Sequence, residues 1–139
     1  MAVHQSSFVA KTPGRGTTNV TAEVQSIADA SGIKTGICTV FIQHTSASLL
    51  ITENADPDVR IDLETWMKNA VRDGDPEFVH DAEGPDDMSA HVRTVLTDTT
   101  ITVPVRNGKL ALGTWQGVYV WEHRTSPHER RLVVTILGE

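Results

Sequence analysis

Residues 35–43, TGICTVFIQ, are almost continuously apolar and rich in β-branched side chains. Such a run predicts a strand that other layers cover on both faces. The next apolar run, ASLLITE at 47–53, predicts a neighbouring strand. A chain with two such runs in succession has to fold around a β-sheet.

Further strands are predicted at both ends of the chain. The weak alternation over 3–10 predicts a first strand, which stops at the turn-forming sequence TPGRG. The last third of the chain predicts four more strands, at 99–105, 110–115, 117–124 and 130–138. Strands in this order pair mostly as antiparallel neighbours.

Three helices are predicted from apolar residues at helical spacing. The first lies between Asn19 and Gly32, the second begins at the candidate N-cap Asp56 with Pro57 in its first turn, and the third begins at the candidate N-cap Asp87. The residues expected to face inward are Val20, Val24, Ile27 and Ala28 in the first helix, Val59, Leu63, Trp66, Met67 and Ala70 in the second, and Met88, Val92, Val95 and Leu96 in the third.

The length and the order of these elements predict the fold class. With 139 residues, 39% of them hydrophobic, the chain suits one compact domain over 1–139. We expect an α+β domain with a mostly antiparallel, curved or sandwich-like sheet and about three helices packed outside.

The single cysteine, Cys38, excludes an internal disulfide and a cysteine-rich zinc site. A reducing cytoplasm is therefore the expected compartment. The N-terminus lacks the basic and apolar regions of a signal peptide, and no 18 apolar residues run together. We expect a protein that is neither exported by an ordinary signal nor inserted in a membrane.

Charge is unevenly distributed along the chain. The net charge is −6, but residues 53–87 contain twelve acidic and three basic residues, so that the rest of the chain carries +3. No dense basic stripe is present, which argues against a nucleic-acid partner. The acidic segment is either a solvated helix and loop or a region that recruits a divalent cation.

Three histidines stand at places where chemistry is plausible. His44 ends the inward row of strand 35–43, His80 lies in the acidic polar loop 73–87, and His91 borders the apolar stripe of the third helix. Each could be satisfied by ordinary hydrogen bonds. Together they resemble the three-nitrogen set that leaves an open position on zinc or a similar metal.

Two acidic positions also have both a structural and a functional interpretation. In the structural interpretation, Asp86 and Asp87 stabilise the start of the third helix. In the functional interpretation, they support a metal-bound imidazole or act as a general base. Glu122 lies on the inward row of its strand with Arg124 next in that row, so it is either half of a buried Glu–Arg pair or an acid that lines a site.

Small polar groups provide candidate ligand contacts. The sequence LGTWQG at 112–117 offers the hydroxyl, indole and amide of Thr114, Trp115 and Gln116 between two glycines. Ser46, beside His44, offers a hydroxyl to the same ligand. No phosphate loop, serine nucleophile elbow or dinucleotide fingerprint is present.

Several long motifs occur in an order that resembles one family. They are QHTSASLLITENADPDVRIDLE, HDAEGPDDMSAH, TVPV, LGTWQGVYVWEHR and RRLVVTILGE, and they extend from about residue 7 to residue 139. The chain resembles the YjbQ-like family, also called the secondary thiamine-phosphate synthase enzyme family. The resemblance implies a bent β-sandwich-like sheet, a homotrimer and a metal-binding histidine cluster, which falls here on His44, His80 and His91. The family's Glu-x-Arg falls on Glu122, His123 and Arg124.

The resemblance also implies an activity, the coupling of a hydroxymethylpyrimidine diphosphate to a thiazole phosphate with release of pyrophosphate. A divalent metal, with zinc favoured and magnesium possible, would neutralise the leaving diphosphate. Arg124 would hold a phosphate and Trp115 would stack on the pyrimidine, so a small phosphorylated metabolite is the expected partner.

Two other functions fit the same residues. One is metal-dependent hydrolysis of a small metabolite, with Asp87 or Glu122 as the base. The other is a non-catalytic trimer that binds a metal or metabolite and uses the histidines to join a strand end, a loop and a helix.

Overall fold

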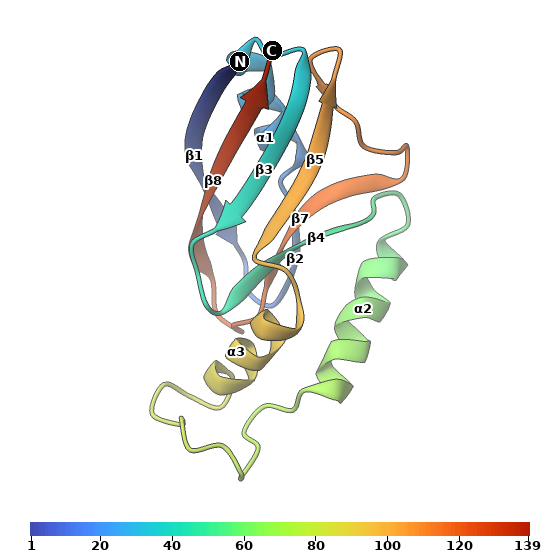
Figure 1. Ribbon diagram of the computed structural model, residues 1–139. Helices are drawn as coiled ribbons and strands as arrows, with labels where there is room; N and C mark the ends of the chain where they lie inside the picture. The colour runs from blue at the N-terminus through green and yellow to red at the C-terminus, as the bar shows by residue number, and fades with distance from the viewer.

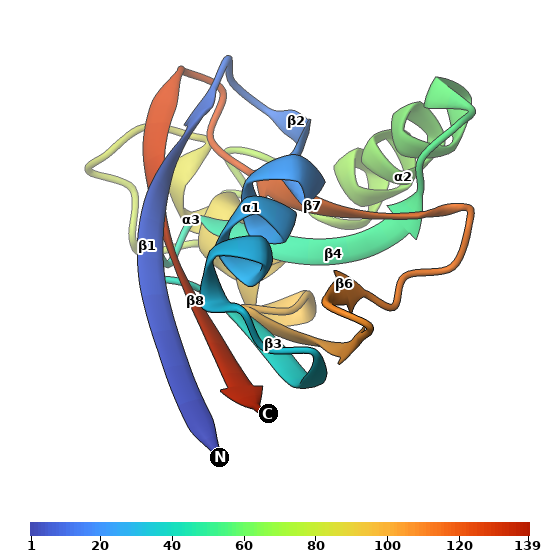
Figure 2. The ribbon, with the colours of Figure 1, turned by 90° about the horizontal axis from the view of Figure 1, so that it is seen from above.

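In the computed structural model, which describes residues 1–139, eight strands form two antiparallel sheets (Figure 1). The larger sheet has the strand order β1-β8-β3-β5-β6 and the smaller has the order β2-β7-β4. Seen from above, the two sheets curl around a shared interior (Figure 2). The predicted α+β class with curved antiparallel sheets is confirmed.

The elements follow one another with short connections except before α3, where the polar loop lies. Their bounds are β1 Ala2–Thr12, β2 Gly16–Asn19, α1 Thr21–Ser31, β3 Thr35–Ile42, β4 Ala47–Glu53, α2 Pro57–Ala70, α3 Asp87–Leu96, β5 Thr100–Arg106, β6 Lys109–Leu110, β7 Gln116–Glu122 and β8 His128–Gly138.

The centre of the core is the inward row of β3 against that of β8. In this register Cys38 lies opposite Ile136, and the following alternate residues of both strands pair in the same way. Because side chains alternate along a strand, every second residue points inward. The fully buried members of the two rows are Cys38, Val40, Ile42, Leu132, Val134 and Ile136.

The outer face of β3 is less covered than its apolar sequence predicts. Ile37 and Phe41 are 49% and 46% exposed. The expectation that both faces of this strand are buried is therefore wrong for the single chain. Two apolar side chains on an exposed sheet face are available to a neighbouring molecule.

Helix α1 packs on the concave side of the sheets, between β1 and β8 on one side and β7 on the other (Figure 2). It buries Val24 and Ala28 and ends at Gly32, whose φ of 68° is left-handed and favours glycine. Helices α2 and α3 lie together at one end of the molecule (Figure 1).

The start of α2 is as predicted, but its inward face is not. Asp56 caps the helix by accepting a hydrogen bond from the backbone N–H of Asp58, and Pro57 is the first helical residue. Of the predicted stripe only Met67 is fully buried, and Trp66 is 65% exposed. The helix touches the smaller sheet over a narrow line of contact.

Helix α3 turns a mostly polar face inward, contrary to the prediction, and of the predicted stripe only Val92 packs against the small apolar cluster around Met67. Val95 and Leu96 are 84% and 61% exposed, and Asp86 rather than Asp87 precedes the first turn. The rest of the inward face meets charged groups, which is why apolar spacing was a poor guide here. Its buried residues are Asp87, Ser89, Ala90, Arg93 and Thr94.

Two strand predictions also need correction. Strand β2 was not predicted, and the predicted strand 110–115 shrinks to the two residues of β6. The residues after it turn, because the side chain of Gln116 accepts a hydrogen bond from the N–H of Gly113 and the Trp115 carbonyl accepts one from Asn54. None of the three helices combines the length and the apolar character that a bilayer crossing needs.

Candidate metal centre

The start of α3 and the loop before it bring His80, Asp87 and His91 together. Asp87 and His91 are four residues apart and so share one face of the helix. His80 Nε2 lies 2.7 Å from Asp87 Oδ2, and His91 Nε2 lies 3.3 Å from the same oxygen. The three candidate ligand atoms lie within 4.8 Å of one another.

The tautomer of His91 follows from its second nitrogen. His91 Nδ1 lies 2.9 Å from the carbonyl oxygen of Thr45, in the turn between β3 and β4. Because a carbonyl only accepts, Nδ1 carries the hydrogen, and the Nε2 of a neutral ring presents a lone pair toward Asp87. Metal-ligating histidines are commonly held by this kind of bond to a carbonyl.

Asp87 is almost completely buried and is held as a carboxylate. Burial by itself raises the pKa of Asp87, but the hydrogen bond from His80 and the positive charge of Arg124 hold that pKa below its ordinary value. A carboxylate oxygen therefore faces the lone pair of His91 Nε2. These two atoms repel unless a proton or a metal cation lies between them, so the group fits a cation.

Arg124 connects the loop to the helix rather than pointing into open space. Its Nη1 donates to Asp87 Oδ1 at 2.9 Å, its Nε donates to Asp86 Oδ2 at 3.0 Å, and its Nη2 donates to the carbonyl of Glu83 at 3.0 Å. These bonds raise the pKa of Arg124, with Asp86 the main cause. All three nitrogens have partners, so a phosphate would have to displace one.

Asp86 completes this connection. Its Oδ2 also accepts hydrogen bonds from the N–H and the hydroxyl of Thr125, at 2.9 and 3.1 Å. Burial raises the pKa of Asp86, but the Thr125 and Arg124 bonds outweigh burial and lower it to about 2. The carboxylate thus joins the start of α3 to the segment that follows β7.

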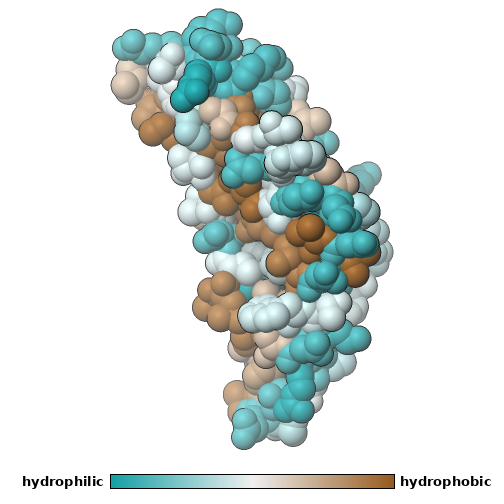
Figure 3. All heavy atoms as spheres, turned by 90° about the vertical axis from the view of Figure 1, so that its right-hand side faces the viewer, coloured by the Kyte–Doolittle hydropathy of each residue, from teal (hydrophilic) through white to brown (hydrophobic).

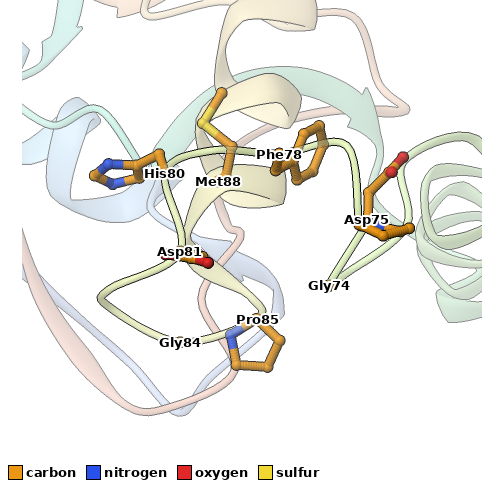
Figure 4. A pocket seen from close by; sticks show the side chains of 9 residues that line it. Gly74, Asp75, Phe78, His80, Asp81, Gly84, Pro85 and Met88 are labelled. Carbon is orange, nitrogen blue, oxygen red and sulfur yellow. The ribbon is translucent and has the colours of Figure 1, made fainter.

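A cavity of about 330 Å³ opens beside His80. Loop 74–85 curls below α3, and Met88 lies between His80 and Phe78 (Figure 4). Asp75 and Asp81 contribute acidic groups, and no lysine or arginine lines the cavity. The space therefore favours neutral, aromatic or cationic groups over a bare anion.

His44 lies outside the His80–Asp87–His91 group. Its Nε2 accepts the backbone N–H of Arg131 at 2.7 Å, and its Nδ1 lies 3.4 Å from Arg130 Nη1. Burial, followed by the charge of Arg130, lowers the pKa of His44. The strand end reaches the candidate metal centre through Thr45 instead of through His44.

Glu122 forms the buried Glu–Arg pair, with Arg130 as its partner instead of Arg124. Arg130 donates to both carboxylate oxygens, Thr12 donates from its hydroxyl at 2.6 Å, and the backbone N–H of Arg124 donates at 3.1 Å. Burial raises the pKa of Glu122, but the bonds from Arg130 and Thr12 bring it below its ordinary value. Four donors occupy this carboxylate, which leaves little room for a substrate.

Ser46 belongs to the same buried network. Its hydroxyl accepts a hydrogen bond from Arg130 Nη2 at 3.0 Å, and the side chain is 9% exposed. The hydroxyl supports Arg130 instead of facing the cavity beside His80.

Thr114, Trp115 and Gln116 lie far from the histidines. They precede or begin β7, whereas Glu122 ends it, so the strand separates them by about 20 Å. Trp115 is 63% exposed. Within one chain these three residues and the candidate metal centre are at opposite ends of a strand.

The sequence pattern assigned no role to Arg130 or to His123. Arg130 lies on the same inward-facing row of β8 as Leu132 and Val134. The alternation of side chains that placed Glu122 inward could therefore also have identified Arg130 as its partner. His123 is fully buried, its Nε2 lies 2.8 Å from Ser48 Oγ, and burial with the charge of Arg93 lowers its pKa to about 3. No sequence signal distinguished His123 from an exposed histidine at a strand end.

Known proteins resemble this chain over nearly its full length. The family model described as UPF0047 protein YjbQ-like matches residues 5–139. A UPF0047 protein of Synechocystis sp. is 48% identical over 136 residues, which cover 98% of this chain and 92% of that protein. The UPF0047 protein YjbQ of Escherichia coli O157:H7 is 37% identical over 137 residues, which cover 98% and 99%.

Solved structures show the same fold. A YbjQ-like protein of unknown function from Sulfolobus solfataricus P2 matches with a TM-score of 0.86 and 27% identity over 99% of this chain and 100% of that one. A hypothetical protein from Aeropyrum pernix K1 matches with a TM-score of 0.88 and 29% identity over 97% and 98%. This chain belongs to the YjbQ-like, or UPF0047, family.

Proposed function

We propose that His80, Asp87 and His91 bind a divalent metal ion and that the centre acts on a small phosphorylated metabolite. The observation that carries the proposal is the bond from His91 Nδ1 to the Thr45 carbonyl, which leaves the Nε2 lone pair facing the Asp87 carboxylate. Asp87 takes the place that the sequence pattern gave to His44.

The donor set favours zinc. Two imidazole nitrogens and one carboxylate oxygen match the three protein ligands of open zinc sites, whereas magnesium prefers oxygen ligands and water. When bound, the ion would supply Lewis-acid polarisation of a phosphoryl or carbonyl oxygen.

The surrounding residues of the chain hold and screen this centre. Arg124 fixes one oxygen of Asp87 and leaves the other for the ion. Phe78 and Met88 offer apolar surface to a flat ring, and the acidic groups of the cavity repel a phosphate that is not neutralised by a cation. A ligand would therefore set its ring in the cavity and its phosphate against the metal.

The reaction proposed first is the coupling of a hydroxymethylpyrimidine diphosphate to a thiazole phosphate. A carbon–nitrogen bond forms, the bond between the same carbon and the diphosphate oxygen breaks, and pyrophosphate leaves with the electron pair. The family resemblance supports this reaction, and Phe78 is better placed than Trp115 to contact the pyrimidine.

Metal-dependent hydrolysis is the second candidate, favoured by one observation. The cavity beside His80 has no cationic side chain, although a coupling enzyme has to hold two phosphorylated substrates. Hydrolysis of a single, less highly charged substrate needs no such group.

We also propose that the chain assembles as a homotrimer in the cytoplasm. Apolar patches interrupt the polar surface on the side that carries α2 (Figure 3), and Trp66, Val95, Leu96 and Phe41 are all substantially exposed. In an assembly, Thr114, Trp115 and Gln116 of one copy could reach the metal centre of another. The single, buried cysteine supports a reducing compartment.

Purified protein supplied with zinc and the two phosphorylated substrates tests the reaction. Formation of the coupled product and pyrophosphate by the wild type, lost in Asp87→Asn and kept in the exposed control Asp62→Asn on α2, supports the coupling reaction. Release of phosphate without a coupled product supports the hydrolase. If neither product forms at any metal concentration, both catalytic candidates fail.

A further inference from the structure

A second cavity, of about 420 Å³, lies between α2 and β2 and shares no residue with the candidate metal centre. Figure 2 shows the two elements side by side at the upper right. Strand β2 and the residue before it contribute Arg15, Gly16 and Thr17, and α2 contributes Pro57, Arg60, Ile61, Glu64, Thr65 and Lys68.

The basic residues of an acidic segment converge on this cavity. Residues 53–87 contain only three bases, Arg60, Lys68 and Arg72, and two of them line it. Arg15, the residue just before β2, joins them. The cavity is therefore basic although the segment around it carries a large negative charge.

Glu64 is the one carboxylate that lines this cavity, and its negative charge already has partners. Glu64 Oε2 accepts a hydrogen bond from Arg93 Nη1 at 3.1 Å, and its Oε1 accepts one from the indole N–H of Trp121 at 3.1 Å. Arg93 is fully buried, so its charge sits directly behind Glu64. Both oxygens of Glu64 are thus occupied, and its charge is offset by Arg93.

Two of the three bases have no acidic partner. Arg15 is paired with Asp73, but Arg60 donates only to the carbonyl of Glu53, at 2.7 Å, with its guanidinium 5.0 Å from the ring centre of Tyr119. Lys68 forms no ion pair with any carboxylate of the chain. Most of the donors of Arg60 and all those of Lys68 remain available.

We propose that the cavity between α2 and β2 binds a small phosphate-bearing metabolite. Arg60 and Lys68 supply charge, and the hydroxyls of Thr17 and Thr65 supply further hydrogen bonds to phosphate oxygens. Exposed Ile61 offers apolar contact to the rest of the ligand. Neither the metal centre nor the reaction proposed for it is needed for this binding.

Isothermal titration with inorganic pyrophosphate, in the presence of a metal chelator, tests the proposal. The wild type binds the probe, and Lys68→Met and Arg60→Met each weaken binding by about tenfold or more. Arg72→Met removes the same charge from the same segment but outside the cavity, and it leaves binding within about twofold of the wild type. Lys68 forms no ion pair, so its replacement leaves the fold intact.

Three results would overturn the proposal. One is the absence of binding by the wild type at millimolar pyrophosphate. Another is equal weakening by Arg72→Met and Lys68→Met, which would indicate diffuse attraction to the surface. The third is loss of binding in His80→Ala under chelation, which would place the probe at the candidate metal centre. Failure of the metal proposal alone leaves the expected results of this titration unchanged.

Discussion

His91 donates its Nδ1–H to the carbonyl oxygen of Thr45, 2.9 Å away, and this bond joins α3 to the turn between β3 and β4. The turn is built by the sheet core, and α3 has few apolar contacts of its own to fix its position. The bond therefore sets both the place and the tautomer of a candidate metal ligand. The sheet positions the candidate centre through a backbone oxygen.

Arg124 is predicted to tune the affinity for metal without ligating it. Arg124→Met frees the Asp87 carboxylate to rotate, and we expect zinc to bind about 10- to 100-fold more weakly. Competition with a chromophoric chelator measures the change. Arg131→Met, which removes an exposed arginine from β8, serves as the control; an unchanged zinc affinity in Arg124→Met would show that the arginine does not hold Asp87 in place.

Glu122 is predicted to be a stability determinant. Glu122→Gln leaves the buried Arg130 without a counter-charge, and we expect the free energy of unfolding to fall by about 3–5 kcal/mol. Urea denaturation measures the loss, with the exposed Glu129→Gln as the matched control. A loss no larger than that of the control would mean that Glu122 and Arg130 are not a buried pair in solution.

His123 is predicted to make stability depend on pH. Burial lowers its pKa from 6.5 to about 3 in the folded chain, so the unfolded chain binds a proton that the folded chain does not. The contribution of His123 to the free energy of unfolding is complete above pH 6.5. It is lost as the pH falls toward 3, by up to about 1.4 kcal/mol per pH unit.

Urea denaturation at several pH values between 7 and 4 measures this dependence in the wild type and in His123→Gln. The variant should lose stability less steeply with falling pH than the wild type. His128→Gln, at a half-buried position in β8, should keep the wild-type slope. Equal slopes in the wild type and His123→Gln would contradict a neutral, buried His123.

The exposed apolar residues of α3 are predicted to lie in a subunit interface. Light scattering coupled to gel filtration should give about three times the chain mass of 15.2 kDa for the wild type and a smaller species for Val95→Glu. Val79→Glu, at an exposed valine of the polar loop, should stay trimeric. A wild type that elutes at the mass of one chain would contradict the proposed trimer.

Most of the fold prediction rested on the alternation of inward-facing and outward-facing side chains along the strands. It placed Cys38, Val40 and Ile42 on one buried row and put Glu122 inward, because a buried sheet face fixes the register of every strand in it. The same rule fails at residues 110–115, where a side-chain bond from Gln116 turns the backbone.

Helical spacing was less informative for α3 and for the site. Its inward side meets Asp73, Glu64 and Arg124 instead of an apolar layer, so apolar residues such as Val95 face outward. Residue type alone suggested that His80 and His91 lie close together, and their ring centres are 5.5 Å apart. It could not exclude His44, because the contact that holds this ring is a backbone N–H of Arg131.

The most direct test of the account is a calorimetric titration of zinc into chelator-treated protein. We expect a single zinc per chain for the wild type and for His44→Ala, and no measurable binding for Asp87→Asn or His91→Ala. Wild-type affinity in Asp87→Asn, or loss of zinc in His44→Ala alone, would contradict the assignment of the metal to His80, Asp87 and His91.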